Sequence, residues 1–210
     1  ADRLRTLIQE VYEQQIRAQR SELKQLQSQI NPHFLYNSFY ILHRMTTLAD
    51  LEGIGRFTKH LGDYFRFITR SEGDEVTLEA EMKHAYAYVE IQSFRFYNRI
   101  SAELAELPEP FRKLRVPRLI VQPIVENAYK HALEKKAAGG LLTIRFDDEP
   151  DKLRIVIEDN GPGMDPRERV RLNAVLASDR ADLEEITGLM NIHRRLRIKY
   201  GQAAGVAIGA

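Results

Sequence analysis

The sequence predicts an α+β protein in which a helical hairpin precedes an α/β sandwich. Residues 2–50 are rich in Gln, Glu, Arg, Leu and Ala and contain no glycine, a composition that favours helix. Residues 142–146 and 153–157 alternate apolar and polar side chains, which is typical of paired strands. Helical segments around these strands indicate an antiparallel or mixed sheet that carries helices on one face.

Two helices are predicted before residue 70, over 2–50 and 54–69, with Gly53 and Gly55 ending the first. Two apolar stripes for helix pairing lie along the first helix and are out of register with each other, the first at Leu4, Ile8 and Val11 and the second at Leu23, Leu26 and Ile30. The second helix has an apolar side of its own, at Phe57, Leu61, Tyr64, Phe65 and Ile68. Two helices cannot enclose a core, whereas two copies make a four-helix bundle, so a homodimer is predicted.

The polar turn at residues 71–74 marks the predicted boundary between domains 1–74 and 75–210. The second domain is expected to contain a helix from Leu78 to Tyr97 capped by Thr77, a strand over 100–104, a helix from Pro117 to Lys136, the hairpin over 142–157 and a helix over 189–200. Residues 166–186 are polar and predict no definite element. Residues 205–208 have the pattern of an unfinished strand, so a truncated C-terminus is expected.

Composition and charge exclude several classes. Of the 210 residues, 43% are hydrophobic and 29% are charged, with a formal net charge of +1, which predicts no nucleic-acid binding. No cysteine is present, which excludes disulfides and thiolate metal sites. No stretch approaches the roughly 20 apolar residues of a membrane-spanning helix.

Residues 29–37, Gln-Ile-Asn-Pro-His-Phe-Leu-Tyr-Asn, carry the first chemical candidate. Pro32 removes one helical hydrogen bond and predicts a kink. His33 follows it, and Asn37 lies one turn later on the same face. A neutral imidazole has a ring nitrogen that can attack phosphorus. A proline kink beside a dimer-interface histidine is the alternative interpretation.

A second candidate is the apolar segment 119–128, which abruptly carries Glu126 and Asn127 and is followed by Lys130 and His131. An amide oxygen suits Mg²⁺, which takes only one or two protein oxygens, so Asn127 is the candidate metal ligand. Lys130 and His131 are placed to meet phosphate oxygens. A helix that passes from core to surface would show the same pattern.

The third segment is the most specific, because strand 153–157 ends in Glu-Asp-Asn-Gly-Pro-Gly-Met. Asp159 can accept a hydrogen bond from the adenine amino group, whereas guanine would leave this carboxylate unpaired at a cost of about 1–3 kcal/mol. Gly161 and Gly163 let the backbone approach a flat base, which a Cβ would block. An ordinary Asn-Gly turn is the alternative.

A fourth segment, Thr187, Gly188 and Leu189, directly precedes a predicted helix. Free amide groups at a helix N-terminus bind phosphate. A simple helix start explains this pattern equally well.

In this order, the four segments resemble the sensor histidine kinases of the LytS/YesM type, over nearly the whole chain. The resemblance implies that His33 is the phosphoacceptor, that Asn127 holds Mg²⁺, and that the ATP-binding fold is the one shared with gyrase and the heat-shock chaperones. Residues 92–96, Gln-Ser-Phe-Arg-Phe, are similar to a further signature of that family.

The implied function is autophosphorylation of His33 from Mg-ATP, followed by transfer to an aspartate on a response-regulator receiver domain. Residues 164–187 would close as a lid, and Asn37 would position a water for the reverse, phosphatase reaction. The parent protein would be anchored in the cell membrane through segments that precede this chain, with the chain itself in the cytoplasm.

Two positions depart from the family pattern. Ile186 replaces the first glycine of the second glycine box, which affects the phosphate loop, and Phe34 follows His33 where several kinase families have an acidic residue. The general base must then come from elsewhere, and Glu126 is the candidate. An ATP-hydrolysing machine of the same fold and a non-catalytic nucleotide-binding dimer scaffold are the rival functions. Neither needs a histidine in the setting of His33.

Overall fold

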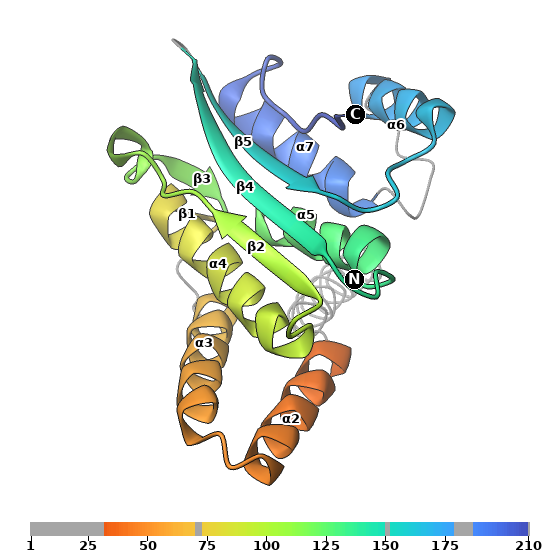
Figure 1. The fold of residues 1–210 in the computed structure, drawn as a ribbon. Coiled ribbons are helices and arrows are strands. Elements are labelled where there is room, and N and C mark those ends of the chain that lie inside the picture. Colours follow the sequence, from red (N-terminus) through yellow and green to blue (C-terminus); the bar gives the residue numbers. More distant parts are fainter. Residues whose placement is uncertain (1–31, 70–72, 150–151, 179–186, 210) are drawn as a thin grey trace, which may run out of the picture. The chain divides into compact units, whose positions relative to one another are not determined.

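A computed structural model describes residues 32–69, 73–149, 152–178 and 187–209, whose elements are drawn in Figure 1. The chain divides into two compact units, residues 1–54 and 55–210. The two predicted stripes between Leu4 and Ile30 lie outside the described residues, and the domain boundary at residue 74 remains a prediction. Among the described helices, none is long and apolar enough to cross a membrane.

The first described helix, α2 (Pro32–Thr47), is followed after a short turn by α3 (Leu51–Thr69). Asp50 caps the start of α3, since its Oδ1 accepts the N–H of Gly53 at 2.9 Å. The helix break predicted at Gly53 and Gly55 is therefore wrong, because both glycines lie inside α3. The break lies at the Asp50 cap instead.

Helix α4 (Leu78–Arg95) is a central element of the second unit. It begins where predicted, because Thr77 Oγ1 accepts the N–H of Ala80 at 3.2 Å. The ring of Phe57 on α3 packs edge-to-face on Phe94 of α4, with 5.4 Å between centroids. The apolar side predicted for α3 is confirmed by its most buried side chains, which are Phe57, Tyr64 and Ile68.

Two short strands, β1 (Glu75–Thr77) and β3 (Arg115–Pro117), pair antiparallel and were not predicted. Three residues carry too little alternation to indicate a strand. Pro117 was expected to open a helix, and this is wrong: it ends β3, and α5 (Gln122–Asn127) begins further on. A 3₁₀ turn, η1 (Glu109–Phe111), precedes β3.

The main sheet has three strands, which are β2 (Ile100–Leu104), β4 (Gly140–Glu149) and β5 (Lys152–Asp159). Their order is β2-β4-β5, with β2 parallel to β4 and β4 antiparallel to β5, so the predicted hairpin is confirmed. Leu142 and Ile144 of β4 are buried. The helices α4, α5 and α7 (Thr187–Tyr200) lie on one side of this sheet (Figure 1).

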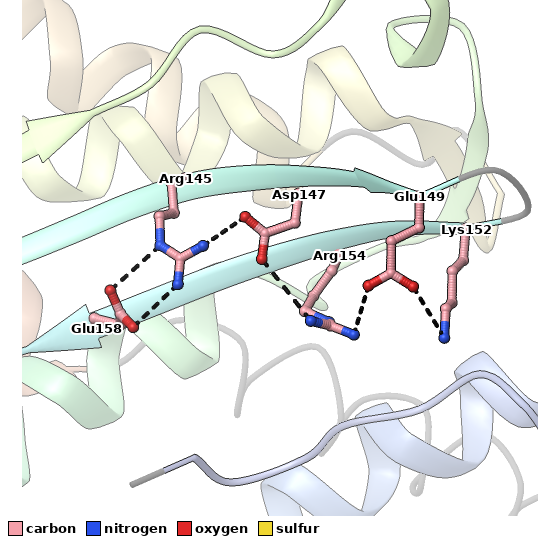
Figure 2. Close-up of polar contacts among 6 residues, drawn as sticks. All are labelled: Arg145, Asp147, Glu149, Lys152, Arg154 and Glu158. Carbon is pink, nitrogen blue, oxygen red and sulfur yellow. Dashed lines mark hydrogen bonds and ion pairs between the residues drawn. The ribbon is translucent and has the colours of Figure 1, made fainter.

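The opposite face of the β4–β5 hairpin carries a row of charged side chains (Figure 2). Arg145 contacts Asp147 and also Glu158, at 3.3 Å. Arg154 lies 2.7 Å from Glu149, which also pairs with Lys152 at 3.2 Å. Acidic and basic groups alternate along this row, so opposite charges face each other across the strands.

The last described segments form a small cluster of their own. Residues 166–186, for which no element was predicted, contain α6 (Pro166–Ser178), and 179–186 lie outside the described residues. The Asn173 side chain bonds both the N–H and the carbonyl of Ile208, at 3.0 and 2.9 Å. The strand predicted over 205–208 is not formed, because these backbone groups bond to side chains instead.

Candidate functional site

The predicted phosphoacceptor segment lies at the start of α2, where His33 is exposed. Pro32 is the first described residue of this helix. The buried residues of the helix are Phe34, Ser38, Ile41 and Met45. The kink predicted at Pro32 involves the residues before it, which lie outside the described ones.

Asn37 lies against the ring of His33. Its Nδ2 atom is 3.3 Å from Nδ1 and 3.3 Å from Nε2 of the imidazole. An amide N–H can donate to whichever ring nitrogen lacks a proton, and the two distances are equal, so this contact selects neither tautomer. The predicted spacing of one helical turn is confirmed, whereas the role of Asn37 with a water molecule remains a prediction.

The helix that carries the second candidate segment changes type immediately after Asn127. Residues Ala128–Leu133 form a π-helix, η2, in which the N–H of Glu134 donates to Tyr129 O at 2.8 Å, five residues back. Tyr129 and Leu133 face the core, while Lys130 and His131 are exposed. π-Turns are rare and occur frequently at functional sites, and no sequence signal indicated this one.

Glu126 has partners within the second unit. Its Oε2 accepts a hydrogen bond from Gln122 Nε2 at 2.9 Å. Burial first, and then the negative charge of the Glu126 carboxylate, raise the pKa of the Tyr64 and Tyr88 phenols above the usual value. Asn127 and Glu126 are both half-buried. The roles of these two residues remain predictions.

The glycine-rich turn after β5 packs against η2. Asp159 is exposed, and its Oδ1 accepts the N–H of Gly161 at 2.9 Å. A Cβ on Gly161 would lie 2.5 Å from the Cβ of Ala132, a residue of η2. Gly161 therefore lets the turn pack closely against η2, and this requirement is separate from any approach to a base. Gly163 has open space and φ of 73°, so its requirement is conformational.

Asn160 is a residue of this turn for which no role was predicted. Its Oδ1 accepts the N–H of Leu141 at 2.8 Å, and its Nδ2 donates to the carbonyl of Gly139 at 2.8 Å. Lys136 donates to both Asn160 Oδ1 and the Asn160 carbonyl, at 3.0 and 2.7 Å. Asn160 thus joins the turn to the start of β4. The only sequence signal for this role was an Asn that stands between Asp and Gly.

The fourth candidate segment forms the beginning of α7, at Thr187. Gly188 is exposed, and a Cβ there would meet nothing within 4 Å, so packing does not require glycine. Leu189 is half-buried, and α7 packs against α5. Ile186 lies outside the described residues, as does part of the predicted lid.

The second unit therefore places a carboxylate beside a helix that carries an amide and two basic side chains. Such a set can hold an adenine amino group through Asp159 and phosphate oxygens through Lys130 and His131. Within the described part of the chain, no group of three or more His, Cys, Asp or Glu residues is placed to hold a metal ion. The amide of Asn127 with phosphate oxygens and water would instead suit Mg²⁺.

Two protein-family models match the chain. The family described as "Histidine kinase" matches residues 21–100, and the family "Histidine kinase-, DNA gyrase B-, and HSP90-like ATPase" matches residues 113–205. The sensor histidine kinase YesM of Bacillus subtilis (strain 168) is 32% identical over 206 residues, which are 98% of this chain and 34% of that protein.

The sensor protein LytS of Oceanobacillus iheyensis is 30% identical over 187 residues, 87% of this chain and 31% of that protein. The chain thus spans about a third of the length of these two curated relatives. The catalytic domain of histidine kinase ThkA aligns in structure with a TM-score of 0.41 and 15% identity, over 60% of this chain and 80% of that one.

Proposed function

Since this chain belongs to the sensor histidine kinases, we propose that it transfers the γ-phosphoryl group of ATP to a ring nitrogen of His33. One observation carries the proposal. The same chain has an exposed imidazole on α2 and, in its second unit, a glycine-rich turn packed on the helix of Asn127 and Lys130.

In the proposed reaction, an unprotonated ring nitrogen of His33 forms a bond to phosphorus while the bond between phosphorus and the ADP oxygen breaks. Asn37, whose Nδ2 lies 3.3 Å from both ring nitrogens, restricts rotation of the imidazole and must move off the attacking nitrogen when the bond to phosphorus forms. The other ring nitrogen loses its proton to a base, for which we retain Glu126 as the candidate. Little covalent work falls to the protein, so positioning dominates catalysis.

The nucleotide is held by residues of the second unit in this proposal. Asp159 accepts a hydrogen bond from the adenine amino group, Lys130 and His131 bind phosphate oxygens, and the N-terminus of α7 at Thr187, Gly188 and Leu189 adds backbone amides. Mg²⁺, coordinated by the Asn127 amide oxygen, would neutralise charge on the phosphates.

Two partners are part of the proposal. A second copy of the chain is proposed to cover α2, whose Tyr36, Phe39 and Tyr40 are 73%, 56% and 69% exposed, to form the four-helix bundle. A response-regulator receiver domain is the proposed acceptor of the phosphoryl group. We also retain the proposal of a membrane-anchored parent with this part in the cytoplasm.

The direct test is labelling of the chain with ATP that carries a radioactive γ-phosphate, in the presence of Mg²⁺. Wild type and His43→Ala, a variant at an exposed histidine of the same helix, should form an acid-labile phosphoprotein. His33→Ala should stay unlabelled. Equal labelling of His33→Ala and wild type would refute the proposal. Steady phosphate release without a phosphoprotein would indicate the ATP-hydrolysing machine, and binding without turnover would indicate the scaffold.

A further inference from the structure

Helix α4 contacts both ends of the continuous helix formed by α5 and η2. Glu81, near the start of α4, binds the residues just before α5. Arg95, the last residue of α4, pairs with Glu134 just after η2. The two helices therefore run in the same direction, and Tyr88 contacts Tyr129 between these ends, with 6.1 Å between ring centroids.

The first contact is a buried carboxylate. Glu81 is 0% exposed and accepts three backbone N–H groups, from Leu119 at 2.9 Å, Ile120 at 2.7 Å and Val121 at 2.9 Å. N–H groups at a helix start have no partner within the helix, and a negative charge there is favourable. Burial raises the pKa of Glu81, and the three N–H groups oppose this by stabilising the ionised form.

The same contact explains why the chain is not helical from Pro117. Leu119 has φ of 56°, an unusual conformation for a residue with a side chain. This conformation directs its N–H and the next two to one carboxylate. The start of α5 is therefore set by Glu81, which lies on another helix.

The second contact is a pair of arginines at the other end. Arg95 binds the Glu134 carboxylate, and Arg99 donates to the carbonyl oxygens of Glu134 at 3.0 Å and Lys136 at 2.6 Å. Both guanidinium groups also lie over the ring of Phe96, at 4.6 and 5.5 Å from its centroid. Carbonyl groups at a helix end lack partners, and positive charge there is favourable.

Asn127, Lys130 and His131 lie on the helix between these two contacts. We propose that Glu81, Arg95 and Arg99 are positioning residues, which hold this helix at both ends and so set the affinity for nucleotide. The inference rests on the proposed function of Asn127 and Lys130. It also gives a physical role to Arg95 and Phe96 of the signature at residues 92–96.

The test measures binding of ATP with Mg²⁺ to the full chain by calorimetry. Arg95→Ala and Arg99→Ala should each weaken binding by about tenfold, as expected for a lost hydrogen bond to a charged group. Arg95→Lys, which keeps the charge, should restore part of the affinity. Arg145→Ala is the matched control, because Arg145 also forms ion pairs but on the outer face of the sheet, and its affinity should equal that of wild type.

Glu134→Gln provides a second route to the same contact without removing a partly buried side chain. Glu134→Gln should weaken binding as Arg95→Ala does. The double variant with both changes should lose no more affinity for nucleotide than either single variant. The NMR signal of the His131 ring should shift in the weakened variants, which a purely stabilising role would not require. Wild-type affinity in both Glu134→Gln and Arg99→Ala would overturn the inference. Absence of binding by wild type would refute the proposed function instead.

Discussion

The ring of His84 on α4 stacks on the ring of Phe67 on α3, with 4.2 Å between centroids and 15° between planes. Tyr64 stacks on the same imidazole at 4.8 Å. His84 is 2% exposed, and among the residues that the structure describes neither of its ring nitrogens has a hydrogen-bond partner. Burial first and the Arg118 guanidinium second lower the pKa of His84 to about 3. A neutral imidazole is therefore part of the α3–α4 packing.

This packing predicts a loss of stability in acid. As the pH falls from 6.5 towards 3, the unfolded chain binds a proton at His84 that the folded chain does not bind. The free energy of unfolding should then fall with decreasing pH, by up to about 1.4 kcal/mol per pH unit from this group. Urea unfolding at pH 7 and pH 5 should show a smaller difference for His84→Phe than for wild type. His43→Gln, at an exposed site, should behave as wild type, and a His84→Phe protein as acid-sensitive as wild type would contradict the prediction.

Gly161→Ala should destabilise the second unit. The new Cβ would lie 2.5 Å from the Ala132 Cβ and 3.0 Å from its Cα. Overpacking of this kind costs about 1–3 kcal/mol, which thermal unfolding would detect. Ala132→Gly in the same chain should recover part of the loss. Gly188→Ala, where the space is open, should leave stability nearly unchanged, and equal behaviour of the two alanine variants would show that this contact has no energetic weight.

Gly163→Ala should be harmful for another reason. Its φ of 73° costs a residue with a Cβ about 1 kcal/mol, although nothing would touch the added atom. Asn tolerates this conformation better than Ala. Gly163→Asn should therefore unfold at a higher temperature than Gly163→Ala. The reverse order would mean that the turn adopts another conformation in solution.

Asn160→Ala should release the start of β4. The Leu141 N–H and the Gly139 carbonyl would lose their partner, at about 0.5–1.5 kcal/mol in total stability for each bond, because both bonds are exposed to solvent. Hydrogen exchange of the Leu141 amide should become faster, while exchange of amides in α3 should not change. Asn160→Asp keeps the acceptor and should protect Leu141 better than Ala does. Unchanged exchange at Leu141 in Asn160→Ala would show that the bond is not maintained.

Local patterns predicted much of this fold. Thr77 and the alternation of β4 and β5 act on residues next to them in the chain, so the helix start and the hairpin were predicted correctly. The helix expected from Pro117 was wrong because Glu81, far away in the sequence, holds the N–H groups of 119–121. A contact of this kind leaves no periodic signal near the residues that it rearranges.

In the candidate site, too, local features were predictable from the sequence and contacts between distant residues were not. The residue types that suit a nucleotide were recognisable, because amides, carboxylates and glycines have limited uses at such positions. Position 161 must lack a Cβ because Ala132 lies against it, and Asn160 acts through its hydrogen bonds with Lys136 and Leu141. These pairings depend on how β5 meets η2, which no single stretch of sequence specifies.

The π-turn over Ala128–Leu133 amounts to one residue more than an α-helix of the same span would hold. Deleting one residue there would restore ordinary helical spacing and leave Glu134 opposite Arg95, because the bulge already absorbs the extra residue. Side chains within the bulge, Lys130 and His131 among them, would instead turn about the helix axis by up to about 100°. The helix would then keep its contacts at both ends and lose the present direction of its exposed basic groups.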